Sequence, residues 1–219
     1  MILKSLKINS VKEGLITNTY IVCDEETKEV LVVDPGGEPE RIIEVINALD
    51  GNLKYIFLTH CHLDHIGGIK GLQDEKGGKI LVSRADSIGL YDEKINLAYY
   101  LDLEVPTLEE NSRLDDGDLI HIGNHEFKVI LTPGHTEGGL CLYDAKEKLV
   151  FTGDTLFSGA WGRTDLPTGD FNKIINSITE RLMTLPDETI VYPGHGDITM
   201  IKDEKNIYLE LKPKDFKLK

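Results

Sequence analysis

The chain has 219 residues, of which 40% are hydrophobic and 28% charged, values typical of a single soluble α/β domain. A formal net charge of −14 argues against nucleic acid or an anionic membrane as a partner, because like charges repel. Three cysteines without a CxxC pair argue against a disulfide framework, and no signal peptide or membrane span is visible, so we expect a cytoplasmic protein.

The first quarter of the chain predicts strands and one helix. Residues 2–8 alternate between apolar and polar side chains, which is typical of a strand. Two short apolar runs, 20–23 and 30–33, flank a polar turn and predict a hairpin. Apolar residues at near-helical spacing predict an amphipathic helix over 40–49. The apolar run 55–58 predicts a buried strand that ends directly before a cluster of histidines.

The rest of the chain alternates between helices and strands. A helix is expected over 66–75 and a strand over 79–82, followed by a helical or irregular excursion over 84–111 that shows no clean period. Further strands are predicted over 119–122, 126–131, 139–143 and 149–152. The last expected elements are a helix over 174–183, a strand over 189–192 and a helix over 202–211.

This order of elements predicts a fold class. Strands and helices are mixed, and hairpins occur early and in the middle of the chain. We therefore expect an α/β fold of two mixed sheets with helices outside, a four-layer αββα sandwich. No short repeat, low-complexity segment or domain boundary is visible, so we expect residues 1–219 to form one domain.

Three of the seven histidines fall within six residues, directly after the strand predicted over 55–58. The segment His60-Cys61-His62-Leu63-Asp64-His65 offers three imidazole lone pairs and a carboxylate anion. A set this dense is costly to hold together without a partner, and metal ions would satisfy all of its groups. A solvated polar loop is the alternative, and the density of donors favours the metal.

Three further ligand candidates share one local setting. His135, Asp154 and His195 each follow a predicted strand and stand directly after a glycine. A glycine lets the backbone turn sharply, and loops at strand ends are where functional groups are usually mounted. One such residue alone is more often structural, but three in the same setting indicate a shared site with the histidine cluster.

The segment Thr59-His60-Cys61-His62-Leu63-Asp64-His65 resembles the TH-x-H-x-D-H signature of metallo-β-lactamase superfamily hydrolases. His135, Asp154 and His195 stand in the order of that family's later metal motifs, and the resemblance runs from about Leu31 to His195. It implies one metal on His60, His62 and His135, a second on Asp64, His65 and His195, and Asp154 as the bridge. It also marks Asp64 and Asp154 as catalytic residues.

Such a donor set implies hydrolysis at a metal centre. Nitrogen and carboxylate ligands suit two divalent ions, with zinc preferred and iron or manganese as alternatives. Two such ions can share a bridging water and lower its pKa to about 7, so we expect a bridging hydroxide to attack a thioester or ester carbonyl. A serine nucleophile is unsupported, because no G-x-S-x-G motif is present. Cys61, His121 and His125 receive no role.

The stretch from Gly153-Asp154 through Gly162-Arg163-Thr164-Asp165 resembles the glyoxalase II branch, the hydroxyacylglutathione hydrolases, and especially its short bacterial members. The resemblance implies that the small-molecule substrate is an S-2-hydroxyacylglutathione thioester. Arg163 stands where larger glyoxalase II enzymes carry a basic residue that contacts glutathione, so it is a candidate for binding a substrate carboxylate. An ion pair of Arg163 with Asp165 or Asp170 is an equally weighted alternative.

Two departures from the larger enzymes leave other reactions open. The chain ends about two dozen residues after His195, without the helical extension that completes their glutathione site, and Thr164 replaces an expected aromatic residue. The Gly162–Asp165 element also resembles persulfide dioxygenases, which use one iron on two histidines and a carboxylate. A lactonase is a further alternative. A non-catalytic binding protein is disfavoured, because all seven ligand positions are filled.

Overall fold

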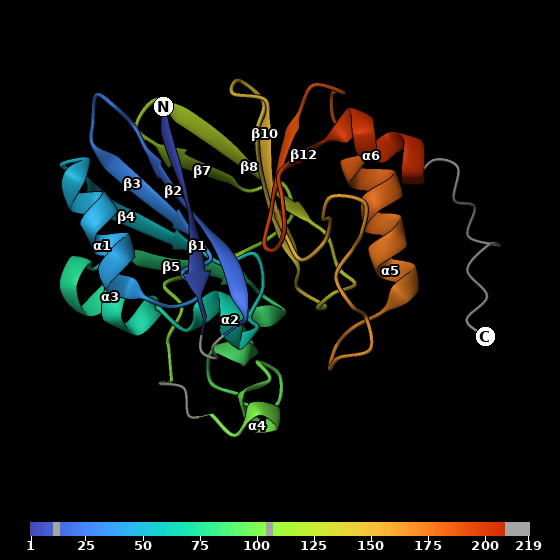
Figure 1. The fold of residues 1–219 in the computed structure, drawn as a ribbon, viewed down its shortest axis with the longest axis horizontal. Helices are drawn as coiled ribbons and strands as arrows, with labels where there is room; N and C mark the ends of the chain where they lie inside the picture. The colour runs from blue at the N-terminus through green and yellow to red at the C-terminus, as the bar shows by residue number, and fades with distance from the viewer. Residues whose placement is uncertain (11–13, 104–106, 209–219) are drawn as a thin grey trace.

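The computed structural model describes residues 1–10, 14–103 and 107–208. Within these residues, two six-stranded sheets lie face to face, and helices cover their outer sides (Figure 1). In the described part of the chain, none of the helices combines the length and the apolar character that crossing a bilayer requires. Cys23, Cys61 and Cys141 are all buried, and none of them forms a disulfide.

The first sheet follows the chain order, β1-β2-β3-β4-β5-β6. β1, β2 and β3 pair antiparallel, whereas β3, β4, β5 and β6 pair parallel, so this sheet is mixed. Its strands are β1 (Ile2–Asn9), β2 (Ile16–Cys23), β3 (Glu29–Val33), β4 (Asn52–Phe57), β5 (Lys79–Ser83) and β6 (Ser112–Leu114).

The second sheet has the order β12-β11-β10-β9-β8-β7. Only β10 and β11 pair parallel, and the other neighbours are antiparallel. Its strands are β7 (Leu119–Ile122), β8 (His125–Leu131), β9 (Leu140–Asp144), β10 (Leu149–Gly153), β11 (Ile190–Pro193) and β12 (Thr199–Met200).

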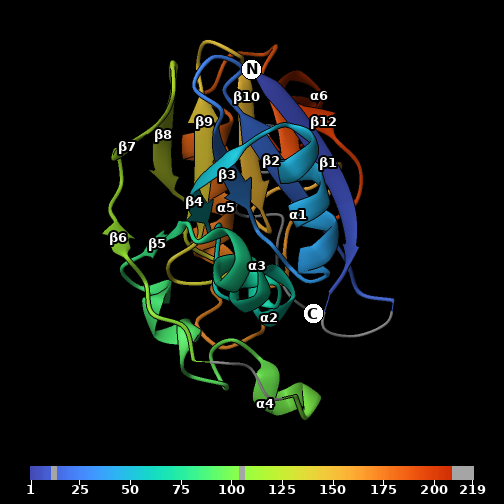
Figure 2. The ribbon, with the colours of Figure 1, turned by 90° about the vertical axis from the view of Figure 1, so that its left-hand side faces the viewer.

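Helices lie on the outer side of each sheet. Figure 2 shows α1 (Pro39–Ala48) and α3 (Ile69–Lys76) in front of the first sheet, and the short α2 (Leu63–Ile66) lies beside them. The second sheet is covered by α5 (Phe171–Asn176), its π-helical continuation η2 (Ser177–Leu182) and α6 (Ile201–Tyr208). The 3₁₀ turn η1 (Asp86–Leu90) and α4 (Ala98–Leu101) belong to an excursion at one end of the sandwich.

Three apolar layers hold the four layers of secondary structure together. Ile46 of α1 belongs to a cluster between the first sheet and its helices, and Phe57 and Phe127 to a cluster between the two sheets. Ile178 of η2 shares the third cluster with Val150 of β10. Each layer removes apolar surface from water, which is the main favourable contribution to folding. The predicted αββα sandwich of two mixed sheets is therefore confirmed.

Several element boundaries differ from the sequence-based expectation. The helix expected over 66–75 is divided into α2 and α3 around Gly67 and Gly68. The helix expected over 174–183 begins earlier, because the Asp170 carboxylate accepts a hydrogen bond from the Lys173 amide and caps α5. β6 and β12 were not expected, since both are too short to show a period. Of the helix expected over 202–211, residues 209–211 lie outside the described residues.

Candidate metal centre

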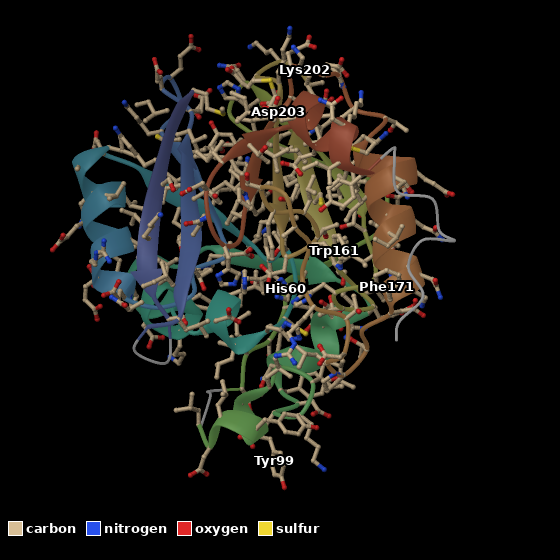
Figure 3. All side chains as sticks on the ribbon, turned by 45° about the vertical axis from the view of Figure 1, so that its right-hand side comes forward. His60, Tyr99, Trp161, Phe171, Lys202 and Asp203 are labelled. Carbon is tan, nitrogen blue, oxygen red and sulfur yellow. The ribbon has the colours of Figure 1, made fainter. Side chains whose placement is uncertain are left out.

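All seven predicted ligands lie at the same end of the two sheets, Asp64 and His65 in the short helix α2 and the other five in loops. β4 leads into the loop that carries His60, β8 leads toward His135, and β10 and β11 end directly before Asp154 and Gly194-His195. β10 and β11 are parallel neighbours, so their ends deliver two of these residues side by side. In Figure 3, His60 lies near the centre of the molecule, where the ends of the strands meet.

The first group consists of His60, His62 and His135. One nitrogen from each ring lies within 4.8 Å of the other two, and all three residues are buried. The closest pair is His62 Nδ1 and His135 Nε2, which are 2.9 Å apart. The three rings meet edge to face around a common point.

The second group consists of Asp64, His65 and His195, again with one donor atom each within 4.8 Å. His195 Nε2 lies 3.2 Å from Asp64 Oδ2 and 3.3 Å from His65 Nε2. Asp154 lies between the two groups. Its Oδ1 is 3.4 Å from His65 Nε2, and its Oδ2 is 3.5 Å from both His135 Nε2 and His195 Nε2.

The backbone fixes which nitrogen of two histidines is free. His135 Nδ1 donates to the Arg163 carbonyl at 2.7 Å, and His195 Nδ1 donates to the Ile16 carbonyl at 2.6 Å. A carbonyl can only accept, so Nδ1 carries the proton in both rings. In the neutral imidazole, Nε2 then presents its lone pair to the centre of the site.

Asp34, which directly follows the strand predicted over 30–33 and received no role there, orients two more rings. Its Oδ2 accepts from His65 Nδ1 at 2.9 Å and from the Thr59 hydroxyl at 2.6 Å. Because the Thr59 proton is used in that bond, His60 Nδ1 donates to the Thr59 oxygen at 3.1 Å. Asp34 thus leaves Nε2 of both His60 and His65 as acceptors, which is how outer carboxylates prepare metal-binding histidines.

Several donor atoms that face the centre lack partners of their own. Within the described chain, His60 Nε2 and Asp154 Oδ1 are buried without a hydrogen bond, and His62 Nδ1 faces the His135 Nε2 lone pair at 2.9 Å. His65 Nε2 and His195 Nε2 are 3.3 Å apart, although both are acceptors when the rings are neutral. Buried unpaired polar groups are costly, and facing lone pairs repel. Divalent cations would relieve both problems, so these residues fit the metals that the sequence predicts.

The pKa values divide the donor set into two histidines that are neutral and two that hold a proton more tightly than usual. Burial lowers the pKa of His60 well below its usual value and the pKa of His62 to about 3. Burial alone would raise the pKa of Asp64 and Asp154, but the His65 imidazole beside them lowers both. In turn, the Asp64 carboxylate raises the pKa of His65 and His195, although burial alone would lower it. Binding of a divalent cation by neutral His65 and His195 would therefore displace protons from this group.

Close approach explains two glycines of the site. A Cβ on Gly194 would lie 2.4 Å from Asp154 Oδ1, and a Cβ on Gly162 would lie 2.1 Å from the Asp154 carbonyl oxygen. Any larger residue at either position would push Asp154 out of place. The Gly-His195 pattern noted in the sequence therefore reflects packing against the central carboxylate as well as the turn itself.

Asp86 joins two of the ligand loops and was missed by sequence analysis. Its carboxylate accepts from the Cys61 amide at 3.2 Å, the Thr136 hydroxyl at 2.7 Å and the Gly138 amide at 2.8 Å. Burial raises its pKa despite these bonds. Only the fold brings Asp86 to these loops, so the available signal was limited to an acidic residue just after a predicted strand.

Arg163 is engaged by Asp165. Its Nε and one terminal nitrogen each donate to the Asp165 carboxylate at 2.8 Å, which is a bidentate ion pair, while Asp170 caps α5 instead. The Arg163 side chain is 63% exposed. It also lines the cavity described next, so its carbonyl supports His135 while its guanidinium lies at the rim.

A cavity of about 380 Å³ opens directly over the ligands. His62, Asp64, His135, Asp154 and His195 line its floor. Six apolar side chains form most of its walls, namely Leu15, Leu63, Leu97, Leu101, Phe157 and Leu166. Its volume lies in the range of small-molecule sites.

The two remaining histidines lie away from this cavity. His121 is exposed on β7, 4.0 Å from Glu126. His125 is buried at the start of β8, the end of that strand opposite to the one that leads to His135. Its ring lies among the carboxylates of Asp24, Asp144 and Glu147.

Residues 13–195 match the family model described as the metallo-beta-lactamase superfamily. The chain belongs to the metallo-β-lactamase superfamily. Members of this superfamily bind divalent metals, and its general reaction is hydrolysis. The His and Asp groups described above are groups that could hold such ions.

Relatives within the superfamily differ in their named activities. The chain is 37% identical over 193 residues to the hydroxyacylglutathione hydrolase GloC of Haemophilus influenzae, covering 86% of this chain and 89% of that protein. Among solved structures, the BLEG-1 B3 metallo-beta-lactamase has a TM-score of 0.87 and 31% identity, covering 94% of this chain and 97% of that chain.

Two further superfamily structures are similar over nearly the whole chain. TTHA1623 in a di-iron-bound form has a TM-score of 0.82 and 30% identity, covering 95% of this chain and 100% of that chain. ETHE1 from Myxococcus xanthus has a TM-score of 0.77 and 30% identity, covering 95% of this chain and 83% of that chain. The superfamily assignment is therefore shared by neighbours of several kinds.

Proposed function

We propose that the protein is a thioester hydrolase with two divalent metal ions, and that S-2-hydroxyacylglutathione-type thioesters are its leading substrates. The seven converging donor atoms carry the proposal: one group of three on each side of Asp154, with free lone pairs pointing inward. The similarity to a hydroxyacylglutathione hydrolase supports the thioester. Zinc is our first choice of metal, with iron or manganese as alternatives.

His60, His62 and His135 would hold one ion, Asp64, His65 and His195 the other, and Asp154 would contact both. Bound at this site, the ions would supply Lewis acidity and make water easier to deprotonate. Hydrolysis forms a C–O bond from water to the acyl carbon and breaks the C–S bond, which releases a carboxylate, a thiol and one proton.

The protein's own groups have separate tasks in this reaction. The ionised Asp64 lines the cavity and would orient the attacking water and accept its proton. The Asp154 carboxylate lies between three imidazoles and would hold the two ligand groups at a fixed separation. The leucine-lined walls would keep bulk water from the reacting carbonyl.

Arg163 is our candidate contact for a glutathione carboxylate. Its guanidinium stands at the cavity rim, but Asp165 already occupies two of its donors. A substrate carboxylate would therefore have to use the remaining N–H groups or displace Asp165. Arg163→Lys keeps the positive charge but cannot form a bidentate pair. The activity of this variant toward a glutathione thioester therefore shows whether binding depends on the charge alone or on the bidentate geometry.

The test is an assay of metal-replete protein with S-lactoylglutathione, measured together with the metal content per chain. We expect turnover at two metal ions per chain and loss of turnover after chelation. Asp154→Asn should lose both activity and metal. The proposal would be refuted by metal-replete protein that hydrolyses no thioester of glutathione or of any other thiol.

A second candidate function is a persulfide dioxygenase-like reaction at a single iron, favoured by the similarity to ETHE1 from Myxococcus xanthus. The two readings differ in metal content and in oxygen consumption. One iron per chain and oxygen uptake with glutathione persulfide would establish this candidate, whereas two ions and anaerobic thioester cleavage would establish the hydrolase. Lactones belong in the same panel, because a cyclic ester presents a similar carbonyl to the site.

A further inference from the structure

The walls of the cavity are apolar to an unusual degree for a site that would bind a charged tripeptide. Glutathione carries two carboxylates and an ammonium group. Among the described residues that line the cavity, Arg163 is the only charged side chain that is not a proposed metal ligand. Its guanidinium is already paired with Asp165. The cavity therefore offers little to a polar ligand beyond its floor and one rim cation.

Two of the wall leucines remain partly exposed to solvent. Leu15 and Leu101 are 36% and 38% exposed, although a leucine at the rim of a cavity gains from being covered. They come from different parts of the chain, Leu15 from the turn before β2 and Leu101 from α4. Both segments lie at the end of the sandwich where the ligand loops gather (Figure 1).

Leu97 is placed in the cavity at a cost in backbone energy. It precedes α4 with φ +74° and ψ 0°, a left-handed conformation that is unfavourable for a residue with a large side chain. Strain of this kind persists only where the surroundings impose it, and it concentrates at ligand sites. The strained backbone of Leu97 therefore serves to place its side chain in the wall of the cavity.

Asn96 supplies the surroundings that impose this conformation. It is fully buried, its side-chain amide donates to the Gly89 carbonyl at 2.8 Å, and its side-chain oxygen accepts from the Ala98 amide at 3.0 Å. Its backbone carbonyl accepts from the Leu63 amide at 2.9 Å, within the metal-ligand loop. The excursion that carries Leu97 is thus anchored directly to the candidate metal centre.

We infer that this wall is an acyl-binding surface, so that the enzyme selects thioesters with apolar acyl groups of medium length. The inference rests on the proposed thioesterase function, and within that function it ranks thioesters with apolar acyl groups above the hydroxyacylglutathione thioesters. The leucines bury the acyl chain while the carbonyl lies over the ligands. The thiol portion, at the rim with Arg163, contributes less to recognition.

The experiment varies the acyl group and the thiol independently. Metal-replete protein is assayed with acetyl, butyryl, hexanoyl and octanoyl thioesters of glutathione and of N-acetylcysteamine, a neutral thiol. We expect kcat/KM to rise about threefold to fourfold for each added methylene until the cavity is full, because each methylene leaves water. The same rise should occur with both thiols.

Four outcomes separate the acyl-chain inference from the proposed thioesterase function. A rise with acyl length supports the inference. A flat or falling series, with acetyl or lactoyl thioesters still hydrolysed, overturns it and leaves the proposed function in place. No hydrolysis of any thioester removes the proposed function itself. A dependence on the thiol alone also overturns the inference, because recognition would then lie at Arg163.

Matched leucine variants locate the surface. Leu97→Ala should lower the octanoyl-to-acetyl ratio of kcat/KM by about tenfold, and Leu101→Ala should lower it by less, because Leu101 is partly exposed. Leu119→Ala is the control, since Leu119 is half-exposed on β7 and does not line this cavity. Unchanged ratios in both cavity variants, with melting temperatures like the parent's, would contradict the assignment of the wall.

Discussion

Two buried clusters of histidine and carboxylate lie at opposite ends of β8, and they differ in what their nitrogen atoms face. At the ligand end, His65 and His195 point their Nε2 atoms at each other, 3.3 Å apart. At the other end, His125 Nε2 lies 3.5 Å from Asp24, and its Nδ1 lies 3.8 Å from Asp144. The composition of the two clusters is alike, but their geometry is not.

The comparison shows which arrangement calls for a cation. Imidazole nitrogens that face carboxylates can be satisfied by protons on the ring. His65 Nε2 and His195 Nε2 face each other and also share the Asp64 carboxylate, so both cannot carry a proton toward the same space, and a shared divalent cation would stabilise the group. Among the described residues, the groups that could hold a metal all lie at the ligand end, and none includes His125. We therefore expect metal at one cluster and only protons at the other.

The largest expected effect comes from removing one histidine from each cluster. His135→Ala should lower the metal content and reduce thioester hydrolysis by at least about 100-fold, more than the loss of an outer-shell partner usually causes. His125→Ala should keep full metal content and activity, and lose stability because the buried carboxylates of Asp24 and Asp144 would lose the imidazole that lies between them. Metal analysis, kinetics and thermal melts measure the three quantities.

Equal loss of metal from the two variants would contradict the expectation that only the cluster with His135 binds metal. Loss of metal from the His125→Ala protein would mean that the second cluster also binds a cation, or that damage there spreads to the ligand loops. The contrast would be strengthened if both variants had normal circular dichroism spectra and only the His135→Ala variant had a reduced metal content. The His125→Asn variant, which keeps a hydrogen-bonding side chain, checks that the loss of stability comes from unpaired polar groups.

A smaller effect is expected at Asp86, which ties two ligand loops together without facing the cavity. Asp86→Ala leaves the amides of Cys61 and Gly138 without their acceptor, so both loops should loosen. We expect metal affinity to fall by about 10-fold to 100-fold, as for other outer-shell partners. A chelator competition titration measures this fall.

A purely structural role for Asp86 would give a different pattern. The melting temperature would then fall while the metal affinity of the folded fraction stayed constant. Asp86→Asn keeps one carbonyl oxygen, which can still accept from the Gly138 amide, and should retain part of the affinity. Equal affinities for parent, Asn and Ala variants would remove the positioning role.

The fold, and the candidate ligands that the structure brings together, could be predicted from the sequence because both depend on short-range patterns. The apolar runs of β4, β8, β10 and β11 end at glycine, proline or histidine, so strand and ligand are neighbours in the chain. The superfamily signature over 59–65 then indicated that His135, Asp154 and His195, which lie far along the chain, belong to the same predicted site. These features need no knowledge of which loops meet in space.

The supporting residues could not be read in the same way. Asp34 orients His60 and His65 from 26 and 31 positions earlier in the chain, and Asp86 reaches Gly138 from 52 positions away. No local period or spacing encodes such pairs, since they depend on how the sheets stack. Leu97 was hidden for a similar reason, because its strained conformation is imposed by Asn96 and not by its own propensity.

The smallest expected effect concerns acid stability at the proton-only cluster. Hydrogen bonds from the Thr27 amide and, with a smaller effect, from the Asn124 amide lower the pKa of Asp24 to about 2. Since an unfolded aspartate titrates near pH 3.9, the stabilisation is fully present above about pH 4 and is lost as the pH falls toward 2. Asp24→Asn should therefore reduce the slope of the free energy of unfolding against pH between about pH 4 and pH 2, relative to the parent.

Denaturant titrations of the metal-free forms of both proteins measure this slope without interference from metal release. Equal slopes for the two proteins would mean that Asp24 is not preferentially stabilised as an anion in the folded state.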